Sequence, residues 1–131
     1  MSDAPNDLRY TKSHEWLRVN DDGTVTVGIT DHAQDQLGDM VYVEVPEVDQ
    51  AFEAEDACAV VESVKAASDV YAPVACTVVE VNEELADAPE VVNQDPYGAG
   101  WIMKIRPANM DAVEALMDAD SYMAYVEAEE H

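Results

Sequence analysis

Basic residues are scarce in this chain. It has 6 lysines and arginines against 29 aspartates and glutamates, for a formal net charge of −23. Nucleic-acid phosphates require a basic protein surface, so the composition excludes nucleic acid as a partner. The acidic residues are spread along the whole chain and do not form one cluster. We interpret this spread as adaptation of the entire surface to a high-salt cytoplasm, where ionic screening reduces self-repulsion.

Long apolar runs and targeting signals are also missing. No stretch of eighteen apolar residues is present, so a membrane-spanning helix and a membrane partner are not expected. Residues 1–7 contain neither a basic region followed by an apolar one nor the arginines of a mitochondrial transit peptide. We therefore expect a cytoplasmic protein. With 131 residues, 48% of them hydrophobic, the chain can form one domain spanning 1–131.

Cysteines and histidines are few, and their spacing matches no metal-binding motif. Cys58 and Cys76 lie in apolar stretches without a CxxC motif, which favours reduced, buried residues over a disulfide or a metal pair. His14, His32 and His131 are too scattered for a metal motif, so we predict no metal site. No Ser/His/Asp or Cys/His arrangement is supported either, and the sequence predicts no catalytic residues.

Short β-rich segments dominate the middle of the chain. They are bounded by turn residues, and several alternate apolar with polar positions. The expected strands are 24–29, 40–45, 59–64, 69–72, 78–81 and 101–105. The second runs into Pro46, which predicts a strand end or a sheet edge. Many short strands with turns between them predict an all-β barrel or sandwich.

Helices are expected at two places on the periphery of this β core. Thr30 can cap a short helix over 31–37, with Gly38 as a left-handed terminator. Asn109 can cap a second helix that places Val113, Leu116 and Met117 on one face. Residues 121–130 are expected to continue it after a break.

One lysine stands alone in the acidic interval. Lys65 is the only basic residue between Arg18 and Lys104, and it lies in the segment ESVKAASD between two expected strands. It is either an ordinary surface lysine at a hairpin tip or the attachment point of a cofactor. A hairpin tip projects the side chain away from the barrel, and an acylated lysine becomes a long neutral arm with a high effective concentration at a partner site.

The surrounding residues resemble a known family. Residues 62–66 (ESVKA) and 68–74 (SDVYAPV) are similar to the lipoyl-attachment hairpin of the glycine cleavage system H proteins. The similarity extends over nearly the whole chain. It includes four further blocks: 13–16 (SHEW), 27–39 (VGITDHAQDQLGD), 79–85 (VEVNEEL) and 96–101 (PYGAGW).

The resemblance implies a mainly β, barrel-sandwich hybrid fold of the lipoyl/biotinyl-carrier type, with a short internal helix and a C-terminal helix. It implies that Lys65 carries covalent lipoic acid, attached by a lipoate ligase or lipoyl transferase. That enzyme would recognise the hairpin through Glu62, Ser63, Val64 and Ala66. The protein would be a carrier and not an enzyme.

The resemblance also implies a place in glycine catabolism. The arm would take an aminomethyl group from a pyridoxal-phosphate-dependent glycine decarboxylase and present it to a tetrahydrofolate-dependent aminomethyltransferase. Dihydrolipoamide dehydrogenase would then reoxidise the arm. In the family the loaded arm folds into a surface cleft, and the matching carboxylates here are Glu15 and Asp69, which would hold the amine.

Three alternatives remain at this point. A lipoyl relay protein would deliver lipoate to other enzymes, and a lipoyl domain of a 2-oxoacid dehydrogenase complex would share the hairpin. The latter would be shorter and would lack the blocks at 13–16 and 100–101. An interaction module whose lysine is never modified is the third. A biotinyl carrier would present Met-Lys-Met, and the Val64-Lys65-Ala66 sequence excludes it.

Overall fold

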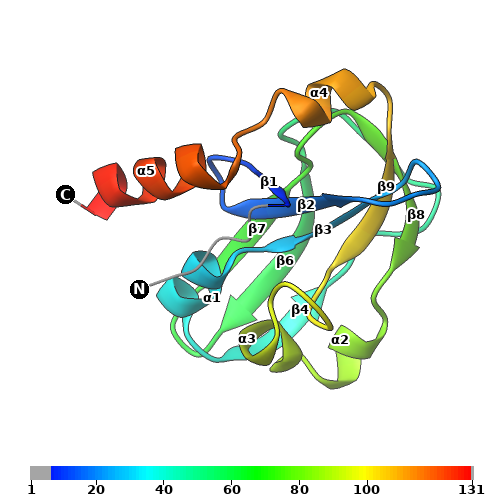
Figure 1. The fold of residues 1–131 in the computed structure, drawn as a ribbon. Helices are drawn as coiled ribbons and strands as arrows, with labels where there is room; N and C mark the ends of the chain where they lie inside the picture. Colours follow the sequence, from blue (N-terminus) through cyan, green and yellow to red (C-terminus); the bar gives the residue numbers. More distant parts are fainter. Residues whose placement is uncertain (1–6, 131) are drawn as a thin grey trace.

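The computed structural model describes residues 7–130, and its framework is built of short antiparallel strands. The strands are β1 (Arg9–Tyr10), β2 (Glu15–Val19), β3 (Val25–Ile29), β4 (Met40–Glu44), β5 (Ala51–Phe52), β6 (Ala57–Ser63), β7 (Ala67–Tyr71), β8 (Cys76–Val81) and β9 (Met103–Pro107). They form a six-stranded sheet in the order β1-β2-β3-β9-β8-β5 and a three-stranded sheet in the order β4-β6-β7. The predicted mainly β fold is confirmed (Figure 1).

All the strands expected from the sequence are present, with shifts of a few residues at their ends. β4 stops at Glu44, before Pro46, and lies at the edge of the three-stranded sheet as predicted. Three strands were not expected: β1, β2 and β5. β1 and β5 have only two residues each, too few for a period-two pattern to show. β2 was not predicted because Glu15, a charged residue, is among its buried positions.

The helices are short, except for the last. They are α1 (Asp31–Leu37), α2 (Glu84–Asp87), α3 (Val91–Gln94), α4 (Met110–Glu114) and α5 (Ala119–Glu130). The Thr30 side chain accepts a hydrogen bond from the Ala33 amide, which confirms the predicted cap of α1. Gly38 ends α1 at φ 88° and ψ −161°, so the prediction of a left-handed terminator is wrong in detail. This extended, positive-φ conformation is open to glycine alone.

The predicted helix after Asn109 is only partly correct. Asn109 does cap α4 by accepting from the Asp111 amide, and Val113 is buried. Leu116 and Met117 lie beyond the end of the helix. The cause is tertiary: the Met117 backbone pairs with Tyr10 through two hydrogen bonds of 2.9 and 3.1 Å, and an extended residue cannot continue a helix. α5 then starts at Ala119, close to the expected 121.

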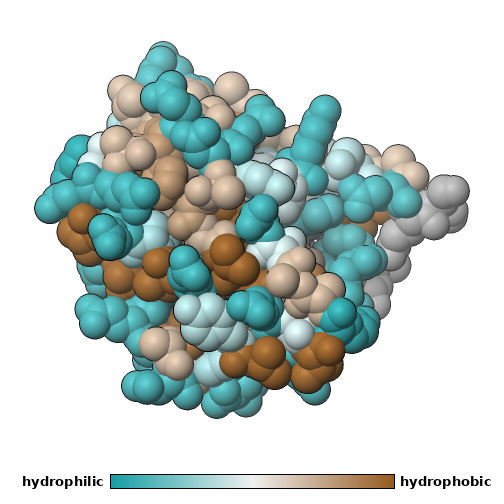
Figure 2. All heavy atoms as spheres, turned by 180° about the vertical axis from the view of Figure 1, so that it is seen from behind, coloured by the Kyte–Doolittle hydropathy of each residue, from teal (hydrophilic) through white to brown (hydrophobic). Residues whose placement is uncertain are grey.

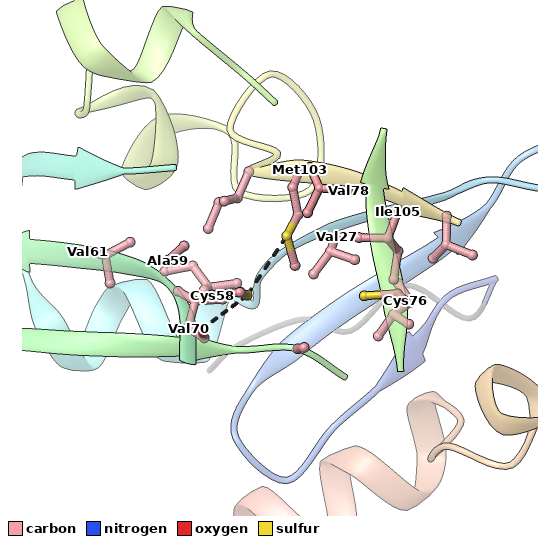
Figure 3. Close-up of a cluster of buried hydrophobic side chains, with 14 of the residues drawn as sticks. Val27, Cys58, Ala59, Val61, Val70, Cys76, Val78, Met103 and Ile105 are labelled. Atoms are coloured by element: carbon pink, nitrogen blue, oxygen red, sulfur yellow. Dashed lines mark hydrogen bonds between the residues drawn. The ribbon is translucent and has the colours of Figure 1, made fainter. Parts of the chain in front are cut away.

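The main hydrophobic core lies between the two sheets. Figure 3 shows part of it, with Cys58 from β6 and Cys76 from β8 among valine, methionine and isoleucine side chains. Both cysteines are buried and free, as predicted. The Cys58 thiol donates to the Val70 carbonyl at 3.2 Å and lies 3.9 Å from the Met103 sulfur. Burial raises the pKa of Cys58 to about 12 and the pKa of Cys76 to about 11.

A second, smaller core fixes α5 to the barrel. Its buried members come from the N-terminal segment, β1, β2 and α5; they are Leu8, Tyr10, Trp16, Ala119, Tyr122 and Val126. The Tyr10 and Tyr122 rings stack with centroids 4.7 Å apart. Figure 1 shows α5 extending from the barrel beside β1. This cluster thus ties the segment around β1 to α5.

The surface is mainly hydrophilic on the face seen in Figure 2, where hydrophobic side chains occur in separate groups. Glu15 is the one fully buried carboxylate among residues 7–129. None of the helices in that range has the length and apolarity needed to cross a membrane.

Candidate functional site

Lys65 lies at the tip of the β6–β7 hairpin, as the sequence predicted. The last strand pair before the turn is Glu62 with Ala67, and the Ser63 amide then donates to the Ala66 carbonyl at 2.7 Å. This bond leaves Val64 and Lys65 as the two residues of the turn. The lysine therefore projects from the end of the three-stranded sheet.

Ser63 builds the turn with its side chain. Its hydroxyl oxygen accepts from the Lys65 amide at 3.2 Å and from the Ala66 amide at 3.0 Å, and the hydroxyl donates to the Ala66 carbonyl at 3.0 Å. A serine hydroxyl that satisfies turn amides in this way stabilises the local conformation. Ser63 was predicted only as a recognition residue, so its structural role adds to that prediction.

The turn is also attached to the neighbouring segment after α1. The Val64 amide donates to the Asp39 carbonyl at 3.0 Å. A methyl group at Gly38 would lie 3.1 Å from Lys65 Cε, so the lysine stem passes directly over this glycine. The end of α1 thus supports the base of the lysine side chain.

The Lys65 side chain is open to solvent. It is exposed, and among residues 7–130 it forms no ion pair; the pairs present there are His14 with Glu129 and Lys104 with Glu80. The exposed position leaves Lys65 accessible to a modifying enzyme.

The other predicted recognition residues differ in exposure. Val64 is 68% exposed and Ala66 is exposed, whereas Glu62 is half-buried and Ser63 is buried. On the adjacent β4, Val41 and Tyr42 are 55% and 46% exposed, close to the turn because Met40 pairs with Ser63. Apolar side chains on this surface lie beside the lysine, where a partner protein could bury them.

Glu15 lies at the start of β2 and is almost fully buried, with 1% exposure. One carboxylate oxygen accepts from the Thr11 hydroxyl, and the other accepts from the Tyr71 amide at 3.2 Å. Burial raises the pKa of Glu15, while the bonds from Thr11 and Tyr71 oppose the shift. The side chain bridges the six-stranded sheet to the outer edge of β7, a contact that local sequence does not reveal.

Asp69 lies on β7, opposite Val60, and is exposed. It is two residues from Tyr71, whose amide binds Glu15. Of the two predicted docking residues, Asp69 is open to solvent and Glu15 is enclosed.

This arrangement fits a covalently attached acyl group. Attachment requires an accessible amine on a turn of defined shape, and the Ser63 network with the exposed Lys65 provides both. The lysine is not desolvated, as a Schiff-base nucleophile would need to be. The geometry suits a carrier of a group better than a reaction centre.

The histidines are arranged differently from what the sequence predicted. The fold brings His14 and His32 together, with ring centroids 4.9 Å apart, and places Glu129 beside them. Burial lowers the pKa of His14, while Glu129 opposes this shift. No sequence signal could have found this group, because Glu129 lies 115 residues after His14. His131 lies outside the described residues.

Relatives cover nearly the entire chain. A family model described as glycine cleavage H-protein matches residues 8–129. A glycine cleavage system H protein from Alkalilimnicola ehrlichii is 58% identical over 99% of this chain and 100% of its own length. One from Halorhodospira halophila is 60% identical over 96% of this chain and 97% of its own length.

A solved structure gives the same result. The crystal structure of a glycine cleavage system H protein from Mycobacterium marinum superimposes with a TM-score of 0.85 at 41% identity, covering 92% of this chain and 97% of that one. Sequence and fold therefore agree. The chain belongs to the glycine cleavage H-protein family.

Proposed function

We propose that this chain is the lipoyl-bearing carrier of the glycine cleavage system, with lipoic acid attached to Lys65. The observation that supports this most is the hairpin itself: an exposed lysine that pairs with no carboxylate of residues 7–130, on a turn fixed by Ser63. When attached, the lipoyl group supplies the dithiolane that accepts and returns the aminomethyl group. The chain supplies the position, the reach and the docking surface.

The hairpin provides what a lipoate ligase or lipoyl transferase would recognise. Val64 and Ala66 offer exposed contacts on either side of Lys65, and Ser63 and Glu62 define the turn and the strand beneath it. Val41 and Tyr42 extend this surface with exposed apolar area. Acylation forms an amide at Lys65 Nζ and removes its charge.

We assign unequal docking roles to Asp69 and Glu15. Asp69 has an exposed carboxylate on the strand that leads away from Lys65, so it can pair directly with the amine of a loaded arm. Glu15 is enclosed and already accepts two hydrogen bonds, so it acts first by holding the β7 edge on which Asp69 lies. It contacts the amine only if the arm opens this region.

The partners that follow are the other components of the system. They are a pyridoxal-phosphate-dependent glycine decarboxylase, a tetrahydrofolate-dependent aminomethyltransferase and dihydrolipoamide dehydrogenase. In this role the chain moves a group between enzymes and catalyses no step itself. The relatives reported above are glycine cleavage H proteins over nearly their full length, so a 2-oxoacid dehydrogenase lipoyl domain is not favoured.

Intact-mass spectrometry after co-expression with a lipoate ligase tests the attachment site. We expect the wild-type protein to gain the mass of one lipoyl group and Lys65→Arg to gain none. Lys104→Arg is the matched control, because it alters another lysine without touching the hairpin. A lipoyl increment in Lys65→Arg, or its absence from the wild type, would contradict the assignment.

A further inference from the structure

Three side chains with metal-binding atoms meet on one side of the molecule, and none of them belongs to the lipoyl hairpin turn. His14 precedes β2, His32 lies in α1 and Glu129 lies in the last turn of α5. One ligand atom from each is within 4.8 Å of the other two. Figure 1 shows α1 and α5 on the same side of the barrel. Nothing in the carrier function requires this convergence.

His32 is a buried imidazole without a hydrogen bond. It is only 5% exposed, and within residues 7–130 its ring is bonded to no other group. No sealed side-chain nitrogen or oxygen in the described part lacks a partner, so the ring nitrogens keep some contact with solvent. A lone pair is therefore available to an ion.

His14 is held in an orientation suited to metal binding. Its Nδ1 lies 2.8 Å from the Tyr122 hydroxyl, which lies 2.7 Å from Thr30 Oγ1. Its Nε2 faces Glu129 Oε1 at 3.3 Å. When a histidine binds a metal through one nitrogen, its other N–H is generally donated to an outer partner that fixes the ring. Tyr122 is in the position of such a partner.

Glu129 is the exposed member of the group. Its side chain is 43% exposed, and its carboxylate raises the pKa of Tyr125, which lies one helical turn earlier on α5. Of the three potential ligands, His14 already has an outer hydrogen-bond partner.

We propose that His14, His32 and Glu129 bind a divalent transition-metal ion such as Zn²⁺. Two imidazole nitrogens and one carboxylate oxygen form a three-ligand set that leaves a fourth position for water, and imidazole favours zinc over calcium or magnesium. Metal–ligand bonds of about 2.0–2.2 Å bring tetrahedral ligand atoms to roughly 3.3 Å from one another. Rotation of the exposed Glu129 side chain can shorten the distances between ligand atoms from the 4.8 Å limit to this value.

The bound ion would join three segments that are distant in sequence. His14 lies in the turn before β2, His32 on α1 and Glu129 near the end of α5, so coordination would clamp α5 against the barrel. The site shares no residue with the lipoyl hairpin. Failure of the metal proposal would therefore leave the carrier proposal intact, and the reverse also holds.

Calorimetric titration of the full chain with ZnCl₂ tests the proposal. Excess Mg²⁺ is included because 29 carboxylate side chains bind divalent cations loosely. We expect one equivalent of Zn²⁺ to bind the wild type. Glu129→Gln should weaken the affinity at least tenfold, and Glu127→Gln, an exposed neighbour on the same helix, should leave it unchanged. Far-ultraviolet circular dichroism establishes that each variant is folded.

Two further readouts separate coordination from a merely structural effect. Tyr122→Phe retains the ring but removes the outer partner of His14, and we expect about 10- to 100-fold weaker binding. Co²⁺ as a spectroscopic probe should give visible absorption bands of a four-coordinate site in the wild type and lose them in His32→Asn. Absence of Zn²⁺ binding by the wild type, or equal affinity in folded Glu129→Gln, would overturn the proposal.

Discussion

Single carboxylates and thiols in this protein have properties set by where the fold places them. Asp69 and Glu15 belong to the same proposed docking site, yet they differ in burial. Asp69 is exposed, whereas Glu15 is buried, with 1% exposure, and both of its carboxylate oxygens accept hydrogen bonds. Cys58 and Cys76 resemble each other in sequence context, and both are buried in the main core. Residue-level predictions therefore follow from burial.

Asp69→Ala should leave lipoylation unchanged and shorten the lifetime of the aminomethyl-loaded arm. A charge-assisted hydrogen bond contributes about 1.5–3 kcal/mol, so decay should accelerate about tenfold or more. Release of ammonia from the loaded protein measures the decay rate. Glu15→Ala should also accelerate decay, and Glu53→Ala is the control because it removes an exposed carboxylate elsewhere. Unchanged decay in both docking variants would refute the docking proposal.

Cys58 and Cys76 should be inert in the native protein. Their pKa values are raised from 9.0 to about 12 and about 11, and thiolate is the reactive form. Alkylation by iodoacetamide at pH 8 should be slow when folded and complete in denaturant. Above pH 9 the unfolded chain loses these protons first, so stability should fall as the pH rises from 9 toward 12. Rapid native alkylation would contradict the buried positions.

At the scale of elements, some helices and strands follow from local sequence, whereas others depend on tertiary contacts. The alternating strands and the Thr30-capped α1 follow from local sequence, and the position of Lys65 follows from the two strands that flank it. α2 and α3 are single turns of four residues, which no isolated segment would form. α2 and α3 depend on tertiary packing, which the hydrophobic periodicity of the sequence does not reveal.

The same division applies to the site. The hairpin, Lys65 and its neighbours could be recognised from a continuous segment. The Glu15–Tyr71 bond joins residues 56 positions apart and the His14–Glu129 contact joins residues 115 positions apart, and only the fold brings them together. Met117 was predicted to be helical from its spacing, and that prediction is wrong because its backbone pairs with Tyr10.

Ser63→Ala should loosen the lipoyl hairpin. It removes two accepted amide bonds and one donated bond, each worth about 0.5–1.5 kcal/mol, so we expect a loss of about 1.5–4.5 kcal/mol in unfolding free energy. Lipoylation should also become slower, because the turn presented to the ligase is less ordered. Denaturant titration and timed mass spectra measure the two effects.

Ser68→Ala provides the comparison for this variant. Ser68 lies on β7, and its hydroxyl makes a single weak contact at 3.5 Å. Neither stability nor the rate of lipoylation should change appreciably. If Ser63→Ala behaved like Ser68→Ala, the turn would not depend on the serine network.

At the scale of the whole molecule, charge dominates. The net charge is −23, and among the described residues Lys104 with Glu80 is the one pair between a lysine or arginine and a carboxylate. The His14–Glu129 contact is an ion pair only when His14 is protonated. Nearly all carboxylates are at the surface, so they repel one another with few cations to compensate. Salt should reduce this repulsion.

Thermal unfolding in NaCl from dilute buffer to molar concentrations tests this expectation. We expect the melting temperature to rise with salt, most steeply at low concentration, where screening changes fastest. A series in sucrose separates screening from general solute effects, because sucrose carries no charge. Equal melting temperatures in dilute buffer and in molar NaCl would refute the proposed high-salt adaptation.

The central claim is that Lys65 makes this protein the carrier of the glycine cleavage system. Glycine–bicarbonate exchange with a glycine decarboxylase measures it most directly, because exchange requires a loaded carrier and no other lipoyl protein is added. Lipoylated wild type and lipoylated Lys104→Arg should support exchange, and Lys65→Arg should give only the background of the decarboxylase alone. Exchange by Lys65→Arg at the wild-type rate would contradict the account.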